Sequence, residues 1–199
     1  ACLLMRQVCE ALQEAHGQGI VHRDLKPDNI MLSAPTGNGE VVKILDFGIA
    51  KVVNENTHET LTQTGYICGT PLYISPEQSL GKQLDGRADL YSVGVILFEL
   101  LTGRQPFVAD TAIALVMKHI HEQPPRLSTD GSERSRWVSA LVWSLMQKQP
   151  SKRLPSSLAV SQVLDVLMED REPDGLLLPP GNPTMNMRSG TGKIGRAHV

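Results

Sequence analysis

The 199-residue sequence has few cysteines, almost no net charge and no long apolar run. Its three cysteines cannot pair completely and show no C-x-x-C spacing, so we expect reduced thiols in a cytoplasmic protein. The net charge of −2 gives no basic field, which argues against a nucleic-acid partner. The longest apolar run, Val93 to Phe98, is far below the roughly 18 residues of a membrane span. No histidine stands at a zinc-like spacing, and His119 and His121 are expected at the surface.

The hydrophobic pattern predicts a mainly helical chain of the α+β class. Apolar residues recur at helical spacing from Leu4 to Ala15, and glycines then end the predicted helix. Residues 30–32 and 41–45 are short β-rich runs joined by a turn-rich linker, which predicts a hairpin. Residues 87–103 are apolar on nearly every side, which predicts a buried helix. Further helices are predicted at 111–121, 133–147 and 156–168.

Two polar segments have no such periodicity. Residues 52–69 carry four threonines, and a loop of this length tends to be functional or disordered. From residue 172 the composition shifts to Pro, Gly, Asn and Met, which predicts a disordered linker over 172–193. The last residues, "IGRAHV" at 194–199, resemble a translated sequencing adapter. We therefore exclude them from fold reasoning as a non-native tail.

The stretch "GIVHRDLKPDNIML", residues 19–32, places charged residues between two apolar patches. A solvated turn would explain the charges alone. It would not require Lys26 two places after Asp24, or Asn29 five places after it. These offsets indicate side chains that meet one anionic, metal-bearing ligand.

The same residues fit H-R-D-L-x-x-x-N, the pattern of the protein-kinase catalytic loop. "DFG" follows at 46–48, and "SPE" stands at 75–77 where the family usually has A-P-E. Because the three motifs occur in this order, residues 1–171 resemble the C-terminal lobe (C-lobe) of a serine/threonine protein kinase. The resemblance is greatest to the eukaryotic-like kinases of bacteria. The resemblance implies a mainly α-helical C-lobe with short β-hairpins around the catalytic loop and DFG. The N-terminal lobe (N-lobe) is absent from the sequence, because no glycine-rich loop and no V-A-I-K lysine occurs in it. We read the chain as a fragment of a longer kinase gene.

The resemblance assigns chemistry to four residues and implies ATP and Mg²⁺ as cofactors. Asp24 would accept the proton of the substrate hydroxyl, and Lys26 would lie beside the γ-phosphate. Asn29 and Asp46 would supply oxygen ligands to Mg²⁺. The alternative, that Asp24 caps a turn and Lys26 is solvated, leaves Asn29 and Asp46 unexplained.

Other residues would shape or support this site. Thr70 would hydrogen-bond towards Asp24 and Lys26; a simple loop hydroxyl is the alternative. Met31 would form the floor under the adenine, supported from the buried helix by Ile96 and Leu100. The residues implied to hold the site without reacting are His22, Arg23, Phe47, Gly48, Glu77, Asp89 and Arg153. Among them, His22 and Phe47 would stack in a spine that runs to Asp89, and Glu77 and Arg153 would form a buried ion pair. Core packing is the alternative for these residues.

Arg23 beside the catalytic aspartate is typical of kinases that are activated by a phosphate in the activation loop. The T-Q-T spacing resembles the doubly phosphorylated segment of bacterial kinases, and this resemblance implies Thr62 and Thr64 as phosphosites, and Thr57 and Thr60 less so. Polar loop residues without a regulatory role are the alternative.

Three functions remain open from the sequence. The first is an active serine/threonine kinase that acts on proteins, with this chain alone inactive. The second is a pseudokinase or scaffold, which the intact catalytic positions disfavour. The third is a metabolite phosphotransferase, which the full activation segment disfavours. A membrane anchor elsewhere in the full-length protein is compatible with each of them.

Overall fold

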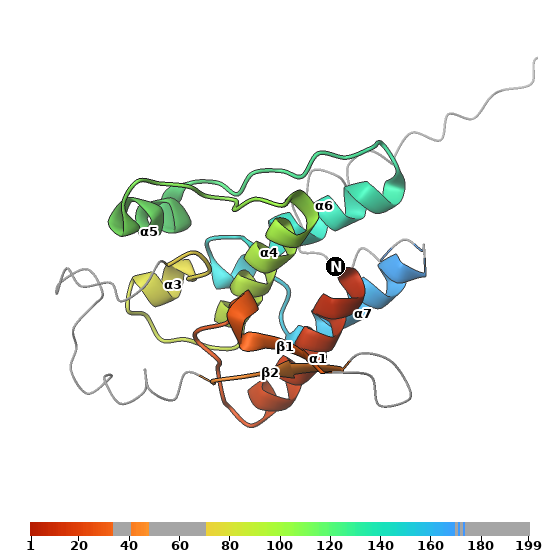
Figure 1. Cartoon of the computed structure of the whole chain (residues 1–199), viewed down its shortest axis with the longest axis horizontal. Helices are drawn as coiled ribbons and strands as arrows, with labels where there is room; N and C mark the ends of the chain where they lie inside the picture. The colour runs from red at the N-terminus through yellow and green to blue at the C-terminus, as the bar shows by residue number, and fades with distance from the viewer. Residues whose placement is uncertain (34–40, 48–70, 170, 172, 174–199) are drawn as a thin grey trace, which may run out of the picture.

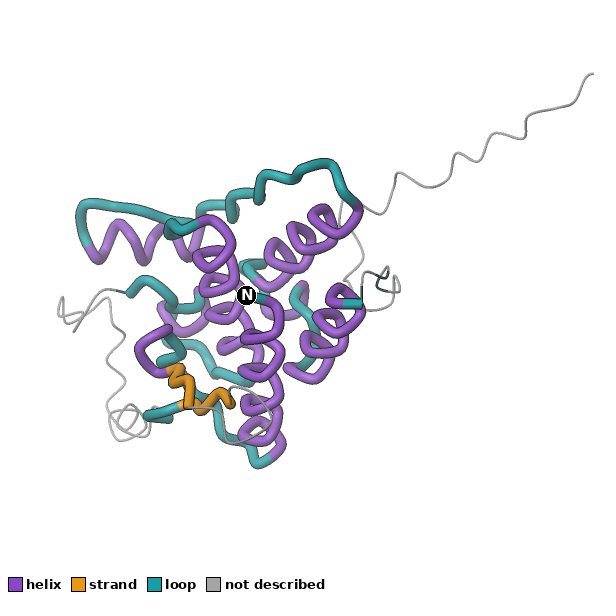
Figure 2. The backbone as a smooth tube through the Cα atoms, turned by 45° about the vertical axis from the view of Figure 1, so that its right-hand side comes forward, coloured by secondary structure: helices purple, strands orange, loops and turns teal. Residues whose placement is uncertain are grey.

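The computed structural model describes residues 1–33, 41–47, 71–169, 171 and 173. The described chain is mainly helical, with a single two-stranded sheet, as the hydrophobic pattern predicts (Figure 1). Figure 2 shows that helices make up most of its volume and that the strands lie to one side. The elements follow in the order α1 (Cys2–Gly17), the 3-10 helix η1 (Pro27–Asn29), β1 (Ile30–Ser33), β2 (Val41–Ile44), α3 (Pro76–Ser79), α4 (Arg87–Thr102), α5 (Ala112–His121), α6 (Glu133–Leu145), the 3-10 helix η2 (Pro150–Lys152) and α7 (Ser157–Met168).

Helix α4 runs through the middle of the molecule (Figure 1). Every residue from Ala88 to Phe98 is buried, which explains why this helix has no polar face. Gly94 allows close contact with α6, because a Cβ atom there would lie 2.8 Å from the Cβ of Leu145. The helix ends at Thr102, and the following Gly103 has a left-handed φ of 70°.

Helices α1 and α7 lie side by side and extend the core on one flank of α4 (Figure 1). Each helix contributes a stripe of buried apolar side chains, as the predicted helical spacing requires. The buried residues are Met5, Val8, Cys9 and Leu12 of α1, and Val160, Val163, Leu164 and Leu167 of α7. The side chains of α1, α4 and α7 thus belong to one continuous hydrophobic core.

The predicted hairpin is present and brings two parts of the site together. Strands β1 and β2 pair antiparallel, with Ile30 opposite Ile44 and Ser33 opposite Val41. Directly after β2, the backbone N–H of Leu45 donates to the carbonyl of Asn29 at 2.8 Å. The residues that follow Leu45 therefore lie beside η1.

The predicted helices are confirmed, with small shifts at their ends. The helices predicted at 133–147 and 156–168 are Glu133–Leu145 and Ser157–Met168. The sequence analysis missed α3 and both 3-10 helices, since elements of three or four residues show no periodicity. No helix in the described part of the chain is long and apolar enough to cross a membrane. Residues 52–69 and the predicted tail at 194–199 lie outside the described residues.

Candidate active site

The carboxylate of Asp89 holds the backbone of the loop that contains Asp24. Asp89 lies in the first turn of α4 and is almost fully buried. Its Oδ2 accepts from the backbone N–H of His22 at 2.8 Å, and its Oδ1 accepts from that of Arg23 at 2.9 Å. The Nε2 of His16, at the end of α1, lies 2.8 Å from Oδ2. A buried carboxylate with several hydrogen bonds can thus fix the loop from the central helix.

The imidazole of His22 joins the loop to the segment after β2. Its Nε2 lies 2.9 Å from the carbonyl oxygen of Leu45, and its Nδ1 accepts from the backbone N–H of Asp24 at 3.3 Å. These contacts require the tautomer protonated at Nε2, because a carbonyl can only accept. The ring also packs against Phe47, with 4.8 Å between ring centroids. His22 thereby links the positions of Asp24 and Phe47.

Two residues of the site have a strained backbone. Arg23 has a φ of 67° and Asp46 a φ of 50°, and no other non-glycine residue in the described ranges has a positive φ. A left-handed conformation costs a residue with a side chain about 1–2 kcal/mol. Such strain persists only where the surrounding contacts over-determine it, and it concentrates at functional sites.

Asp24, Lys26 and Asn29 form the polar face of the loop. The Nζ of Lys26 lies 3.3 Å from Oδ2 of Asp24, and both side chains are more than a third exposed. The buried Asn29 donates its Nδ2 to the backbone carbonyl of Asp24 at 2.8 Å. The donating amide nitrogen faces the loop, so the oxygen of the same amide is the atom that would meet a cation.

Asn29 and Asp46 fit a magnesium ion for which phosphates would supply further ligands. The hydrogen bond between Leu45 and Asn29 places Asp46 at the edge of the loop, where its side chain is exposed. Among the described residues, no group of three or more His, Cys, Asp or Glu side chains could hold a metal by itself. One amide oxygen and one carboxylate suit Mg²⁺, which usually keeps waters and substrate phosphates in its shell.

The side chains of Glu77 and Arg153 form a buried ion pair. Two nitrogens of Arg153 lie 2.6 and 2.8 Å from the two oxygens of Glu77, and both side chains are nearly inaccessible. Arg153 also donates to the carbonyls of Gln147 and Arg87. The pair therefore joins α3 to the start of α4 and to the loop after α6.

Met31 and Leu100 do not lie in the core. Met31, on β1, is 50% exposed and Leu100, on α4, is 46% exposed, whereas Ile96 is buried. Exposed apolar residues on β1 and α4 are compatible with the expected adenine floor. Gly48, Thr62, Thr64 and Thr70 lie outside the described residues.

The expectation that His119 lies at the surface is wrong. Its side chain is buried, and its Nδ1 accepts from the hydroxyl of Tyr91 at 2.9 Å. The Nζ of Lys148 donates to the carbonyl of His119 at 2.8 Å. Burial, aided by the nearby Lys148 charge, lowers the pKa of His119 to about 3. Burial, followed by the charge of Arg153, lowers the pKa of Lys148 to about 8.

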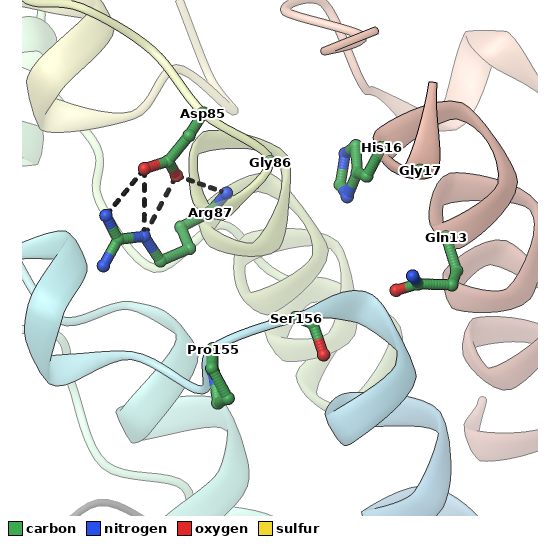
Figure 3. A pocket seen from close by; sticks show the side chains of 8 residues that line it. All are labelled: Gln13, His16, Gly17, Asp85, Gly86, Arg87, Pro155 and Ser156. Carbon is green, nitrogen blue, oxygen red and sulfur yellow. Dashed lines mark hydrogen bonds and ion pairs between the residues drawn. The ribbon is translucent and has the colours of Figure 1, made fainter. Parts of the chain in front are cut away.

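A pocket of about 380 Å³ lies between the end of α1, the start of α4 and the residues before α7 (Figure 3). Figure 3 shows His16 and Gln13 of α1 on one side and the Asp85–Arg87 ion pair on the other. The hydroxyl of Ser157 lies 3.0 Å from Nδ1 of His16, whose Nε2 contacts Asp89. The cavity is lined by Gln13, His16, Gly17, Asp85, Gly86, Arg87, Pro155 and Ser156.

The sequence analysis missed His16 and Gln78, which also contact the site. His16 meets the carboxylate of Asp89, and Gln78 donates its Nε2 to the carbonyl of Arg23 at 2.7 Å. Each partner lies more than 50 residues away along the chain. No local spacing could reveal these pairs. The A-P-E-like motif directly before Gln78 was the only sequence signal near it.

Comparison with known proteins agrees with this arrangement. The family model "Protein kinase domain" matches residues 1–165, and the chain therefore belongs to the protein kinase domain family. It is 43% identical over 172 residues to serine/threonine-protein kinase pkn3 of Myxococcus xanthus, and 46% identical over 167 residues to Pkn1 of the same organism. PknB of Mycolicibacterium smegmatis is 36% identical over 171 residues.

These alignments cover most of this chain but only part of each relative. They include 84% of the chain for pkn3 and Pkn1 and 86% for PknB. The chain spans 31%, 24% and 27% of the length of these relatives, respectively. The resemblance to bacterial serine/threonine kinases of the eukaryotic-like type is thereby confirmed.

Proposed function

We propose that the chain is part of an active serine/threonine protein kinase, which transfers the γ-phosphoryl group of ATP to hydroxyls of protein substrates. The observation that supports this most directly is the joint placement of Asp24, Lys26 and Asn29. All three side chains lie on a loop whose backbone is held by Asp89, and Asp46 is brought to the edge of that loop. A scaffold without catalysis would require none of these four side chains.

We assign the role of base to Asp24. Its carboxylate is partly exposed, so an acceptor hydroxyl can approach and donate its proton. Lys26, 3.3 Å from Asp24, supplies a compact positive charge to the γ-phosphate beside the acceptor. Asn29 and Asp46 would hold Mg²⁺, which neutralises the charge of the phosphates when bound. Positioning and charge neutralisation are what phosphoryl transfer chiefly requires.

We further propose that residues 1–171 form the C-lobe and that activity requires an N-lobe. The exposed apolar residues Met31, Leu32 and Leu100 provide a surface on which an adenine and an N-lobe could pack. The chain alone should show no useful ATP affinity, since it lacks the lysine that pairs with the α/β-phosphates. Micromolar Mg-ATP binding to the isolated chain, measured by calorimetry, would contradict this.

The experiment that tests the function is a phosphotransfer assay with the full-length kinase. Radiolabelled ATP is offered with a set of peptides that contain Ser, Thr or Tyr, and the labelled amino acids are identified. We expect label on Ser and Thr only. Label on none of the peptides, with ATP still bound, would favour the pseudokinase. Label on a small metabolite alone would favour a metabolite phosphotransferase.

The cellular setting follows from the same chemistry. We infer a cytoplasmic kinase domain, because the proposed reaction consumes ATP and the sequence indicates reduced thiols. Its partners would be ATP and proteins that carry an accessible serine or threonine, and we expect no nucleic-acid partner. A membrane anchor elsewhere in the full-length protein is compatible with this placement.

A further inference from the structure

Both backbone polar groups of Arg23 are held by side chains from other elements. Its N–H donates to Oδ1 of Asp89, on α4, at 2.9 Å. Its carbonyl accepts from Nε2 of Gln78, on α3, at 2.7 Å. Arg23 is also one of the two strained residues, with a φ of 67°. Because strain persists only where contacts over-determine it, Asp89 and Gln78 are the evident restraints on this peptide unit.

Gln78 is itself rigidly placed. Its backbone N–H donates to the hydroxyl of Ser75, the N-cap of α3, at 3.3 Å. The preceding residue, Glu77, is locked by its ion pair with Arg153 at 2.6 Å. The hydroxyl of Ser79 returns to the carbonyl of Ser75 at 3.0 Å. The side chain of Gln78 therefore reaches Arg23 from a fixed base.

Helix α3 directly follows residues 71–75, which we call the acceptor-peptide segment because the resemblance implies that the preceding Thr70 shapes the site for the acceptor. Residues 71–75 lead into α3, and the carbonyl of Tyr73 in this segment accepts from the hydroxyl of Ser92 on α4 at 2.8 Å. Gln78 thus connects this segment to the peptide bond directly before Asp24. The carbonyl of that bond belongs to Arg23, and its direction fixes where the Asp24 side chain begins.

We propose that Gln78 is a positioning residue for the catalytic aspartate. By binding the Arg23 carbonyl, it holds the Arg23–Asp24 peptide plane and couples the acceptor-peptide segment to the carboxylate of Asp24. This inference rests on the proposed kinase function. It predicts that Gln78 affects the phosphoryl-transfer step rather than the binding of ATP. Within the described residues, no hydrogen bond joins Gln78 to Asn29 or Asp46, the proposed metal ligands.

The test uses two substitutions in the full-length kinase. Gln78→Met keeps the length of the side chain but removes the donor, and Gln78→Glu places an acceptor against the carbonyl. Gln83→Glu is the matched control, since Gln83 is exposed in the loop after α3 and undergoes the same change of charge. We expect both Gln78 variants to lower kcat by about tenfold, as the loss of one part-buried hydrogen bond would do, with KM for ATP nearly unchanged. The control should match the wild type.

A second measurement requires no catalysis. Hydrogen–deuterium exchange is followed by mass spectrometry in a peptide that covers residues 20–25 and in one from α7. In Gln78→Met we expect faster exchange in the loop and unchanged exchange in α7. Unchanged exchange in the loop, or an equal rise in α7, would overturn the proposal. If the wild-type protein transfers no phosphate but Gln78→Met still speeds exchange in the loop, the contact between Gln78 and the loop is upheld and the kinase function is rejected. A higher KM for ATP with kcat unchanged would also contradict the proposal.

Discussion

The side-chain amide of Asn29 donates to the backbone carbonyl of Asp24 at 2.8 Å. The two residues are thus joined through the main chain of Asp24, and its carboxylate takes no part in this contact. Asn29 is buried, whereas the Asp24 side chain is more than a third exposed. The contact that holds Asn29, the proposed metal ligand, therefore does not involve the carboxylate of Asp24, the proposed base.

This independence predicts the behaviour of Asp24→Asn in the full-length kinase. The backbone carbonyl remains, so Asn29 keeps its place, and Mg-ATP binding should stay within about twofold of wild type. Loss of the base should lower kcat by at least about 100-fold, the usual minimum contribution of a general base. Steady-state kinetics and calorimetry measure the two effects separately. Wild-type turnover by this variant would reject Asp24 as the base.

Asp46→Ala should instead weaken the binding of Mg-ATP. Substitution of residues that only support metal ligands typically costs about 10–100-fold in metal affinity, so loss of a ligand should cost at least as much. Asp28→Ala is the matched control, because Asp28 is an exposed aspartate of the neighbouring helix η1. Calorimetry at several magnesium concentrations tests both variants. Equal affinities for Asp46→Ala and the control would exclude Asp46 as a ligand.

The ion pair between Glu77 and Arg153 predicts a large loss of stability. Arg153→Ala leaves the Glu77 carboxylate buried without its partner, which should lower the free energy of unfolding by about 3–5 kcal/mol. The control is Asp85→Asn, which breaks the partly exposed pair with Arg87 at 2.6 Å and should cost less than about 1 kcal/mol. The free energies of unfolding of the two variants are measured by urea unfolding. Similar losses in the two variants would refute the assignment of a buried pair.

The buried His119 predicts a dependence of stability on pH. Its folded pKa, about 3, lies below the unfolded value of 6.5, so the unfolded state binds the proton first as the pH falls. The contribution of His119 to the free energy of unfolding is complete above pH 6.5. It is lost progressively as the pH falls from 6.5 to 3. From pH 7 to 5 the loss should be about 2 kcal/mol.

The groups that face His119 are Tyr91, Phe107, Lys148 and the backbone of Leu72. His119→Gln keeps a polar side chain but does not titrate, so its unfolding free energy should fall less between pH 7 and 5. Urea unfolding of both proteins at the two pH values gives the difference. An identical fall in the two proteins would show that His119 does not remain neutral in the folded state.

The sequence predicted the parts of the site that local spacing defines. Asp24, Lys26 and Asn29 lie within one loop, and the predicted hairpin leads the chain from Asn29 to Asp46. The contacts of Gln78 and His119 could not be predicted, because their partners are separated from them by 55 and 28 residues. Helical periodicity distinguishes an apolar face from a polar one. It does not show that a polar residue is buried when distant groups satisfy its hydrogen bonds.

The last prediction concerns Thr62 and Thr64, which lie outside the described residues. Arg23 directly precedes Asp24, the proposed catalytic base, and a guanidinium at this place favours an anion. A phosphothreonine supplies about −1.5 to −2 charges and can accept two hydrogen bonds from one arginine. We therefore expect the active full-length kinase to phosphorylate itself on Thr62, Thr64 or both, and the double Ala variant to lose most of its activity. Thr57→Ala is the control and should remain active. Mass spectrometry that finds neither Thr62 nor Thr64 modified in an active preparation would refute this mechanism.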